Sequence, residues 1–239
     1  MSYYNIKLTQ DDAYIKEAPA ASAIIPGHLV ETTSAGKVQV HSGGAKASKT
    51  FALENIPSAG DINLAYAAND SARYGDFRSG SNVYALVAIA APAIALNDDL
   101  ESAGDGSLRK AVGAAVTIAG GDANGSLTFT ANETGPNGND IQIILVTPTS
   151  SPSVAVDGLT ITITPDDTTP TATEVIAQVA ASVAASNLIT ATSPGTGATA
   201  PGTSAGVSLA GGTQVVARAT EAVDNSGGAT AVRIIAEVK

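Results

Sequence analysis

The sequence predicts a mainly β protein in which a small β-barrel or β-sandwich core domain is interrupted by an inserted α+β domain. Three observations support this prediction. No Lys, Arg or His occurs from Ala111 to Ala217, although the chain has 12 Lys and Arg. Short strand patterns separated by turn signals precede this window and resume after it. Inside the window the hydrophobic period changes from that of strands to that of a helix.

The domain boundaries follow from the break in composition. We expect residues 1–112 plus 214–239 to form the core domain and residues 113–213 to form the inserted domain, because the composition returns to its starting character at Arg218. The acids of the window are Asp122, Glu133, Asp140, Asp157, Asp166, Asp167 and Glu174. Two modest domains also suit 239 residues better than one large core.

The apolar content indicates thin cores. The chain has 6 Tyr, 3 Phe and no Trp, so most buried surface must come from Ala, Val, Ile and Leu. Cores of this kind contribute little stability, and oligomerisation often completes them.

The core domain begins with short strands. The expected strands are Tyr4–Gln10, Ala23–Thr32 around a Pro26-Gly27 turn, Lys37–His41, Thr50–Glu54, Ala72–Phe77 and Val83–Ala90. A hairpin follows, with its turn at Ala103–Gly106 and its returning strand at Ser107–Lys110. After the window, strand patterns begin at Gln214 and end with Ala231–Val238. If the window were removed, the strand at Leu108 would run on into Val215.

The inserted domain combines strands with one helix. The expected strands are Ser126–Ala131, Ile141–Val146, Val154–Val156, Leu159–Ile163 and Leu188–Thr192, with a two-residue hairpin turn at Asp157-Gly158. A helix over Ala172–Ala185 is predicted because Val175, Val179 and Val183 fall on one helical face and Thr171 with Glu174 has the form of a capping box. Residues 135–139 read as a turn, and residues 194–206 as an exposed loop.

Composition excludes several classes of protein. The chain has no Cys, so it can form neither a disulfide nor a thiolate metal site. Its N-terminus lacks a signal-peptide pattern, and its longest apolar stretch, Val83–Leu96, is too short to span a bilayer. A net charge of −10 without a basic patch argues against nucleic-acid binding. We expect synthesis in a cytoplasm and no membrane partner.

No residue pattern predicts an active site. His28 and His41 lie at strand ends beside turns, where exposed polar residues are ordinary. The densest acids are Asp98, Asp99, Glu101 and Asp105, but their spacing does not match a calcium-binding loop. Turn and surface roles are therefore favoured for these acids, with a calcium site left open as the alternative. We expect no enzyme activity, no cofactor and no metal.

The N-terminal strand offers the candidate interface residues. These residues are Tyr3, Tyr4, Ile6 and Leu8. Amphipathic aromatic side chains such as Tyr3 and Tyr4 can anchor a partner. The alternative is that this terminal strand packs against its own barrel.

Several segments, taken in their order along the chain, resemble tailed-bacteriophage head decoration (capsid cement) proteins. These segments are Ile25–Glu31, Gly80–Ala90, Asp98–Arg109 and Ala217–Val238. The chain departs from that family by carrying some 100 residues between the Leu108-Arg109 strand and the Ala217-Arg218-Ala219 strand. Within the insertion, Asn132–Ile141 is similar to modules of phage tail sheath and other virion proteins.

The resemblance implies a structural virion protein on the outer surface of an icosahedral phage capsid. Its partners would be the major capsid protein and further copies of itself, as a homotrimer at threefold or quasi-threefold positions. It would stabilise contacts between capsid subunits, with the insertion as an exposed knob. Two alternatives remain: a virion adhesion module whose insertion binds host-surface glycan or protein, and a tail tube or sheath component.

Overall fold

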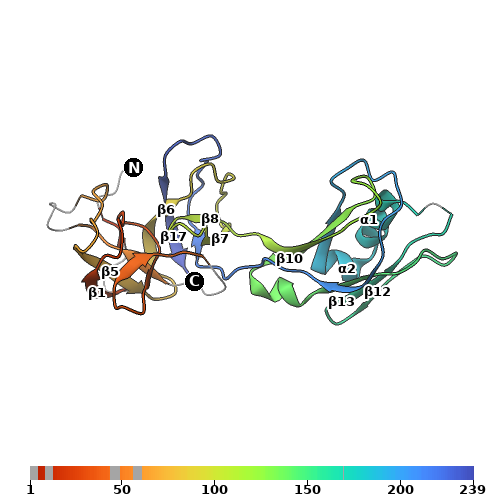
Figure 1. The fold of residues 1–239 in the computed structure, drawn as a ribbon, viewed down its shortest axis with the longest axis horizontal. Coiled ribbons are helices and arrows are strands. Elements are labelled where there is room, and N and C mark those ends of the chain that lie inside the picture. The colour runs from red at the N-terminus through yellow and green to blue at the C-terminus, as the bar shows by residue number, and fades with distance from the viewer. Residues whose placement is uncertain (1–4, 9–12, 44–48, 56–60, 169) are drawn as a thin grey trace. The chain divides into compact units, whose positions relative to one another are not determined.

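The computed structural model describes residues 5–8, 13–43, 49–55, 61–168 and 170–239. The chain is mainly β, as predicted, and its described residues include two α-helices. It divides into two compact units, one comprising Met1–Ala111 and Gln214–Lys239 and the other comprising Val112–Thr213 (Figure 1).

Five strands of the first unit form a closed barrel in the order β16-β17-β6-β8-β7. In chain order they are β6 (Asn82–Val87), β7 (Asp99–Ser102), β8 (Leu108–Lys110), β16 (Ala217–Ala219) and β17 (Val232–Val238). The last strand of the chain, β17, therefore lies between β6 and β16. Figure 1 shows β17 beside β6.

Side chains at alternate positions of β6 and β17 fill the barrel interior. Val83 and Ala85 of β6 pair with Ala236 and Ile234 of β17, and all four side chains are fully buried. Alternate residues of a strand point to opposite faces, so these small and branched side chains fill the inside of the barrel. The predicted Val83–Ala90 strand is present as β6, which ends at Val87.

A second sheet of the first unit has the order β1-β5-β4, beside a separate β2-β3 hairpin. These strands are β1 (Ala13–Pro19), β2 (Val30–Thr32), β3 (Val38–Val40), β4 (Thr50–Ala52) and β5 (Ser71–Phe77). The sequence did not predict β1, because four consecutive residues of this edge strand are exposed and its apolar residues do not alternate. The predicted Tyr4–Gln10 strand lies partly outside the described residues, and its described part, residues 5–8, forms an isolated bridge between Lys7 and Val83.

The expected continuity from Leu108 into Val215 is wrong. Strand β7 lies between β8 and β16, and Leu100 pairs with Lys110 on one side and with Ala217 on the other. The chain thus leaves the barrel on one edge of β7 and returns on the opposite edge, two strand spacings or about 10 Å away. The sequence suggested one continuous strand, but β8 and β16 are separate strands because each pairs with a different edge of β7.

The second unit contains two sheets and the helices. One sheet has the order β14-β10-β9 and the other the order β12-β13-β11-β15. The strands are β9 (Gly113–Ile118), β10 (Leu127–Thr134), β11 (Gln142–Leu145), β12 (Ser153–Asp157), β13 (Thr160–Thr164), β14 (Ile189–Thr192) and β15 (Ser204–Ser208). The helices are the 3₁₀ helix η2 (Pro136–Asp140), α1 (Ala172–Ala181) and α2 (Val183–Leu188). Phe129, Ile143, Ile161 and Val175 meet in its buried core.

The predicted helix over Ala172–Ala185 is two helices. Thr171 caps α1 as predicted, with the backbone N–H of Glu174 donating to Thr171 Oγ1 at 3.2 Å, while the Glu174 carboxylate accepts from the N–H of Asp166 and from Gln178. Ser182 then adopts an extended backbone and its hydroxyl caps α2, so the helical path is interrupted. As a result, Val183 is 74% exposed instead of packing beside Val175 and Val179.

Two further strands and one turn differ from the predictions. The predicted 194–206 loop contains the start of β15, and β9 had no predicted counterpart. The hairpin turn after β12 is Gly158-Leu159, one residue later than predicted, because Asp157 pairs with Thr160. That register places Val156 opposite Ile161 with both facing the core, and core packing decides register where one face is buried.

The two ends of the second unit are joined to each other. Ala115 and Ala210 exchange backbone hydrogen bonds of 2.8 and 3.1 Å. The side-chain amide of Asn139 bonds both the N–H and the carbonyl of Gly212, each at 3.0 Å. A side chain at Gly212 would meet the carbonyl oxygen of Gly135 at 2.2 Å, so only glycine permits this approach. The unit therefore closes on itself where the chain enters and leaves.

A fragment of residues 112–213 should fold by itself, because its core and the clamp between its ends lie within the fragment. It should show mixed α and β circular dichroism and cooperative thermal unfolding. Phe129→Ala should destabilise it by about 3–5 kcal/mol, whereas Thr190→Ala on the exposed face of β14 should cost well under about 1 kcal/mol. Equal effects of the two substitutions would contradict the assigned core.

Candidate interaction surface

The acids that the sequence singled out form ion pairs along β7. Asp98 pairs with Lys110 at 2.9 Å, and Asp99 pairs with Lys239 at 2.9 Å and with Arg218 at 3.6 Å. Their cationic partners come from the end of β8, from β16 and from the C-terminus. Lys110 and Arg218, which flank the cation-free window, therefore attach the strands on either side of it to Asp98 and Asp99, and Lys239 attaches the chain end to Asp99.

Glu101 and Arg109 make the most buried of these ion pairs. The side chain of Glu101 is fully buried, while that of Arg109 is 45% exposed. Two nitrogens of the guanidinium, Nε and Nη2, donate to Glu101 Oε1 at 2.8 Å each. A carboxylate removed from water requires such charge-assisted bonds, so this pair holds β7 against β8.

These contacts give every acid of the group a role in the fold. Asp105 accepts hydrogen bonds from the backbone N–H and the hydroxyl of Ser107 in the β7–β8 turn. Such bonds stabilise the ionised form, and the pKa of Asp105 is lowered although burial opposes this. Within the part of the chain that the structure describes, no cluster of three His, Asp or Glu could hold a metal ion.

His28 is a half-buried residue of the fold and not the exposed residue expected at a strand end. Its Nδ1 accepts a hydrogen bond from the backbone N–H of Ile25 at 3.2 Å. Burial lowers the pKa of His28 to about 4, with the positive charge of Arg233 adding to the effect and Asp105 opposing it. The imidazole is therefore neutral near pH 7.

His41 is also buried, at 3% exposure, which corrects the expectation for this residue. Its Nδ1 lies 2.8 Å from the hydroxyl oxygen of Ser102 at the end of β7. The hydroxyl also accepts from the backbone N–H of Gly104, so the pair joins the end of β3 to the β7–β8 turn. His41 is thus buried beside the β7–β8 turn, whereas His28 is only partly buried.

The N-terminal candidates divide between core and surface. Ile6 is fully buried in the barrel core, and its carbonyl accepts from the N–H of Tyr84 at 2.8 Å. Leu8 is partly exposed and donates its N–H to Asn82. Tyr3 and Tyr4 lie outside the described residues. The burial of Ile6 favours the alternative in which this segment packs against its own barrel.

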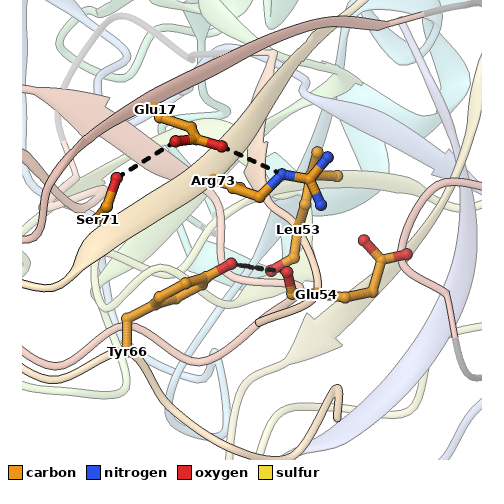
Figure 2. A network of polar contacts seen from close by, with 6 residues as sticks. All are labelled: Glu17, Leu53, Glu54, Tyr66, Ser71 and Arg73. Carbon is orange, nitrogen blue, oxygen red and sulfur yellow. Dashed lines mark hydrogen bonds and ion pairs between the residues drawn. The ribbon is translucent and has the colours of Figure 1, made fainter. Parts of the chain in front are cut away.

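Polar contacts join β1 to β5 and fix the loop before β5 (Figure 2). Glu17 of β1 pairs with Arg73 at 3.6 Å and accepts from the hydroxyl of Ser71 at 3.4 Å. The Tyr66 hydroxyl donates to the carbonyl of Glu54 at 2.7 Å. Burial raises the pKa of Tyr66, as expected for a phenol held as a structural donor.

Arg233 attaches the 61–66 loop to the barrel. Its guanidinium donates to Asn63 Oδ1 at 2.8 Å, to the carbonyl of Pro26 at 3.1 Å and to the carbonyl of Ile62. The guanidinium also lies 5.9 Å from the centroid of the Tyr84 ring. Arg233 therefore serves the fold by bonding segments that are distant in sequence.

One outer face of the second unit is lined by threonines. Thr117, Thr128 and Thr192 form a row across β9, β10 and β14, and Thr130 and Thr190 form part of the next row. The hydroxyls of Thr117 and Thr128 are 2.9 Å apart. Neutral hydroxyl groups on a sheet can bind a polar ligand by hydrogen bonds without any charge.

Comparisons with known proteins add no assignment. No protein-family model matches the chain, and no match was found among curated proteins. Among the described residues, no helix is long and apolar enough to cross a membrane.

Sequence patterns missed the exposed apolar side chains of the first unit. Tyr14 and Ile15 of β1 are 71% and 43% exposed, and Ile89 and Leu96 of the β6–β7 loop are 55% and 58% exposed. The Val83–Leu96 stretch appeared as one apolar run, but β6 ends at Val87 and the rest of the run is a loop. Pro92 within the run was the available signal for this ending.

Glu101→Gln should destabilise the first unit by about 3 kcal/mol, because it removes the charge that compensates Arg109 at a buried site. Glu17→Gln is the matched control: its pair with Arg73 is 3.6 Å long and 59% exposed at Glu17, so the loss should stay under about 1 kcal/mol. Denaturant unfolding followed by the tyrosine near-UV signal measures this unit, since all six Tyr precede the window. A Glu101 effect no larger than the control would refute the assigned role.

Stability should fall in acid because of His28. The unfolded imidazole takes up its proton near pH 6.5 and the folded one only near pH 4, so stability is fully present above pH 6.5 and is lost as the pH falls through this window. The loss should reach about 2–3 kcal/mol near pH 4.5. In His28→Asn, which keeps an acceptor for Ile25, the drop in unfolding free energy from pH 7 should be smaller by that amount. An unchanged drop would exclude a neutral buried imidazole.

Proposed function

We propose that this chain is a structural virion protein that binds the outer face of an icosahedral phage capsid and stabilises contacts between major capsid protein subunits. One observation carries the proposal. Three of the four segments that resemble capsid decoration proteins coincide with strands of the barrel: Gly80–Ala90 contains β6, Asp98–Arg109 contains β7 and most of β8, and Ala217–Val238 contains β16 and β17, while Ile25–Glu31 ends in β2 outside the barrel. The likeness thus concerns one folded body instead of scattered segments.

The proposed domain organisation assigns the two tasks to different parts of the chain. Residues 1–112 plus 214–239 act as the capsid-binding core, and residues 113–213 are an inserted α+β domain exposed as a knob. The clamp between Asn139 and Gly212 supports this assignment, because a domain that closes its own ends can be added to a loop without altering its host.

Clamping a shell requires buried interface and repeated attachment. An interface of standard size buries about 1,600 Å², and a homotrimer at a threefold or quasi-threefold position gains avidity because its copies bind together. Tyr3, Tyr4 and Leu8 are the proposed contacts with capsid or neighbouring subunits, while Ile6 anchors their segment in the barrel. The proposal includes synthesis in the host cytoplasm, and neither a cofactor nor nucleic acid takes part.

Heads of the phage that carries this sequence, prepared without the protein, provide the test. Full-length chain should bind them saturably, and bound heads should retain DNA to a higher temperature than bare heads. Absence of binding to intact heads would contradict the proposed function.

A variant that joins Lys110 to Gln214 through a flexible linker of about six residues should fold and bind the same heads. Such a linker reaches about 20 Å, enough to cross from one edge of β7 to the other. Near-UV circular dichroism checks folding and co-sedimentation checks binding. If the full chain binds heads and the folded variant does not, the knob is part of the capsid contact and the assigned division of tasks is wrong.

The threonine rows favour adhesion to host-surface glycan as the second candidate function. They place hydroxyls on one sheet face of the knob, where a polysaccharide could lie along them. The fragment of residues 112–213 should then give glycan-array signals that Thr128→Val together with Thr192→Val abolish. An array without signal would count against adhesion to glycan. The tail tube or sheath alternative has no comparable support in the barrel.

A further inference from the structure

Strand β14 of the second unit has an open edge. It lies at the end of the sheet β14-β10-β9 and pairs with β10 alone among the strands that the structure describes. An edge of this kind presents backbone N–H and C=O groups to which a further strand can add. Proteins often protect such edges with charge, as β1 does with Lys16 and Glu17 and β12 with Asp157. No charged residue occurs between Glu174 and Arg218, so β14 lacks this protection.

An apolar cavity of about 260 Å³ lies along the open edge of β14. Its lining includes Ile176, Val179 and Ala180 of α1 and Ile189, Thr190 and Ala191 of β14. Ile189 and Ala191 are buried on one face of the strand, whereas Thr190 is exposed on the other. A cavity lined by residues of both faces lies at an edge of the strand, and β10 occupies the opposite edge. The cavity therefore lies between α1 and the open edge.

The cavity suits one apolar side chain. Val179 and Ile189 are almost fully buried, so its floor is the core of the unit, and the exposed Ala180 lies at its mouth. Pockets that hold a whole small-molecule ligand measure about 300–1,000 Å³, which is larger than this cavity. An open strand edge beside a side-chain pocket is how proteins bind extended peptides: main-chain hydrogen bonds supply affinity, and the pocket supplies specificity.

The charge of the second unit indicates which kind of segment would bind. Residues 112–213 include seven Asp and Glu and no Lys, Arg or His, so their net charge is −7. No cation of the unit itself competes for these carboxylates. A segment with Lys or Arg on either side of its apolar residue would be attracted to the unit, whereas a second copy of the unit would be repelled.

We propose that the open edge of β14 and the cavity beside it, together called the β14 groove, bind an extended basic segment of a partner protein. The segment adds to β14 as a further strand and inserts one apolar side chain between β14 and α1. Its Lys or Arg residues remain outside the cavity, where the field of the acids acts on them. This inference is independent of the proposed capsid contact, because every residue of the groove lies in the second unit.

Synthetic heptapeptides test the proposal on the full-length chain. An array of peptides with Lys at both ends, Thr at the intermediate positions and Ala, Val, Leu or Phe at the centre is probed with labelled protein. Peptides with a large apolar centre should bind. Fluorescence anisotropy should show affinity at least tenfold lower when the centre is Ala, because the cavity stays empty, or when both ends are Glu, because like charges repel.

Two substitutions on α1 locate the binding site. Ala180→Trp should close the mouth of the cavity and lower the affinity for the best peptide at least tenfold. Ala177→Trp is the matched control, because it places the same side chain at an exposed position of α1 that does not line the cavity. Far-UV circular dichroism and thermal unfolding verify that both variants are folded.

N-methylation of alternate peptide amides tests the added strand. Only alternate N–H groups of a strand point to one neighbour, so one of the two methylated sets should abolish binding and the other should retain most of it.

The results that would overturn the proposal are distinct. An array without binding, or a folded Ala180→Trp variant that binds peptide like wild type, would exclude the β14 groove as the site. Equal binding by the two methylated sets would exclude strand addition. A wild-type oligomer that Ala180→Trp dissociates in sedimentation velocity would assign the groove to a second copy and so overturn the basic segment as its occupant.

Discussion

The pairing of both edges of strand β7 is the constraint on which the architecture depends. Leu100 pairs with β8 where the chain leaves the barrel and with β16 where it returns. Asp98, Asp99 and Glu101 then receive cations from both of these strands and from the C-terminal Lys239. Strand β7 is short, so its backbone pairing with β8 and β16 is reinforced by these ion pairs. The second unit can therefore begin and end at the barrel without adding a strand to it.

The uneven distribution of charge has a physical explanation in the same contacts. Cations lie beside β7 because buried or crowded carboxylates need them. In the second unit, acids serve turns instead: Asp122 accepts from Thr199 and the N–H of Gly125, and Asp166 accepts from Thr168. These hydrogen bonds lower the pKa of both carboxyls. Acids satisfied by hydroxyls and backbone N–H groups require no lysine or arginine, so a fold built on them can do without cations.

The candidate surface could be predicted only in part. The absence of a recognisable catalytic pattern directed attention to interfaces, and the apolar Val83–Leu96 stretch was visible in the sequence. The sequence could not show which residues of this stretch are buried and which are exposed. Val83 faces the barrel interior and Leu96 faces solvent, although both are ordinary apolar residues. Ile6 shows the opposite error, since a terminal residue chosen as a contact is fully buried. Exposure depends on which neighbours cover a residue, and those neighbours are distant in sequence.

Local chemistry by itself determined the β character of the chain, the Thr171 cap with Glu174 and the β7–β8 hairpin, because each depends on residues a few positions apart. Tertiary structure alone decided the strands β1 and β9, the break at Ser182 and the side of β7 on which each crossing lies. These features depend on partners from other parts of the chain, and hydrogen bonding and packing with such partners outweigh local preference. For the same reason, the sequence shows that the window differs from its flanks, while the route of the chain around β7 required the folded structure.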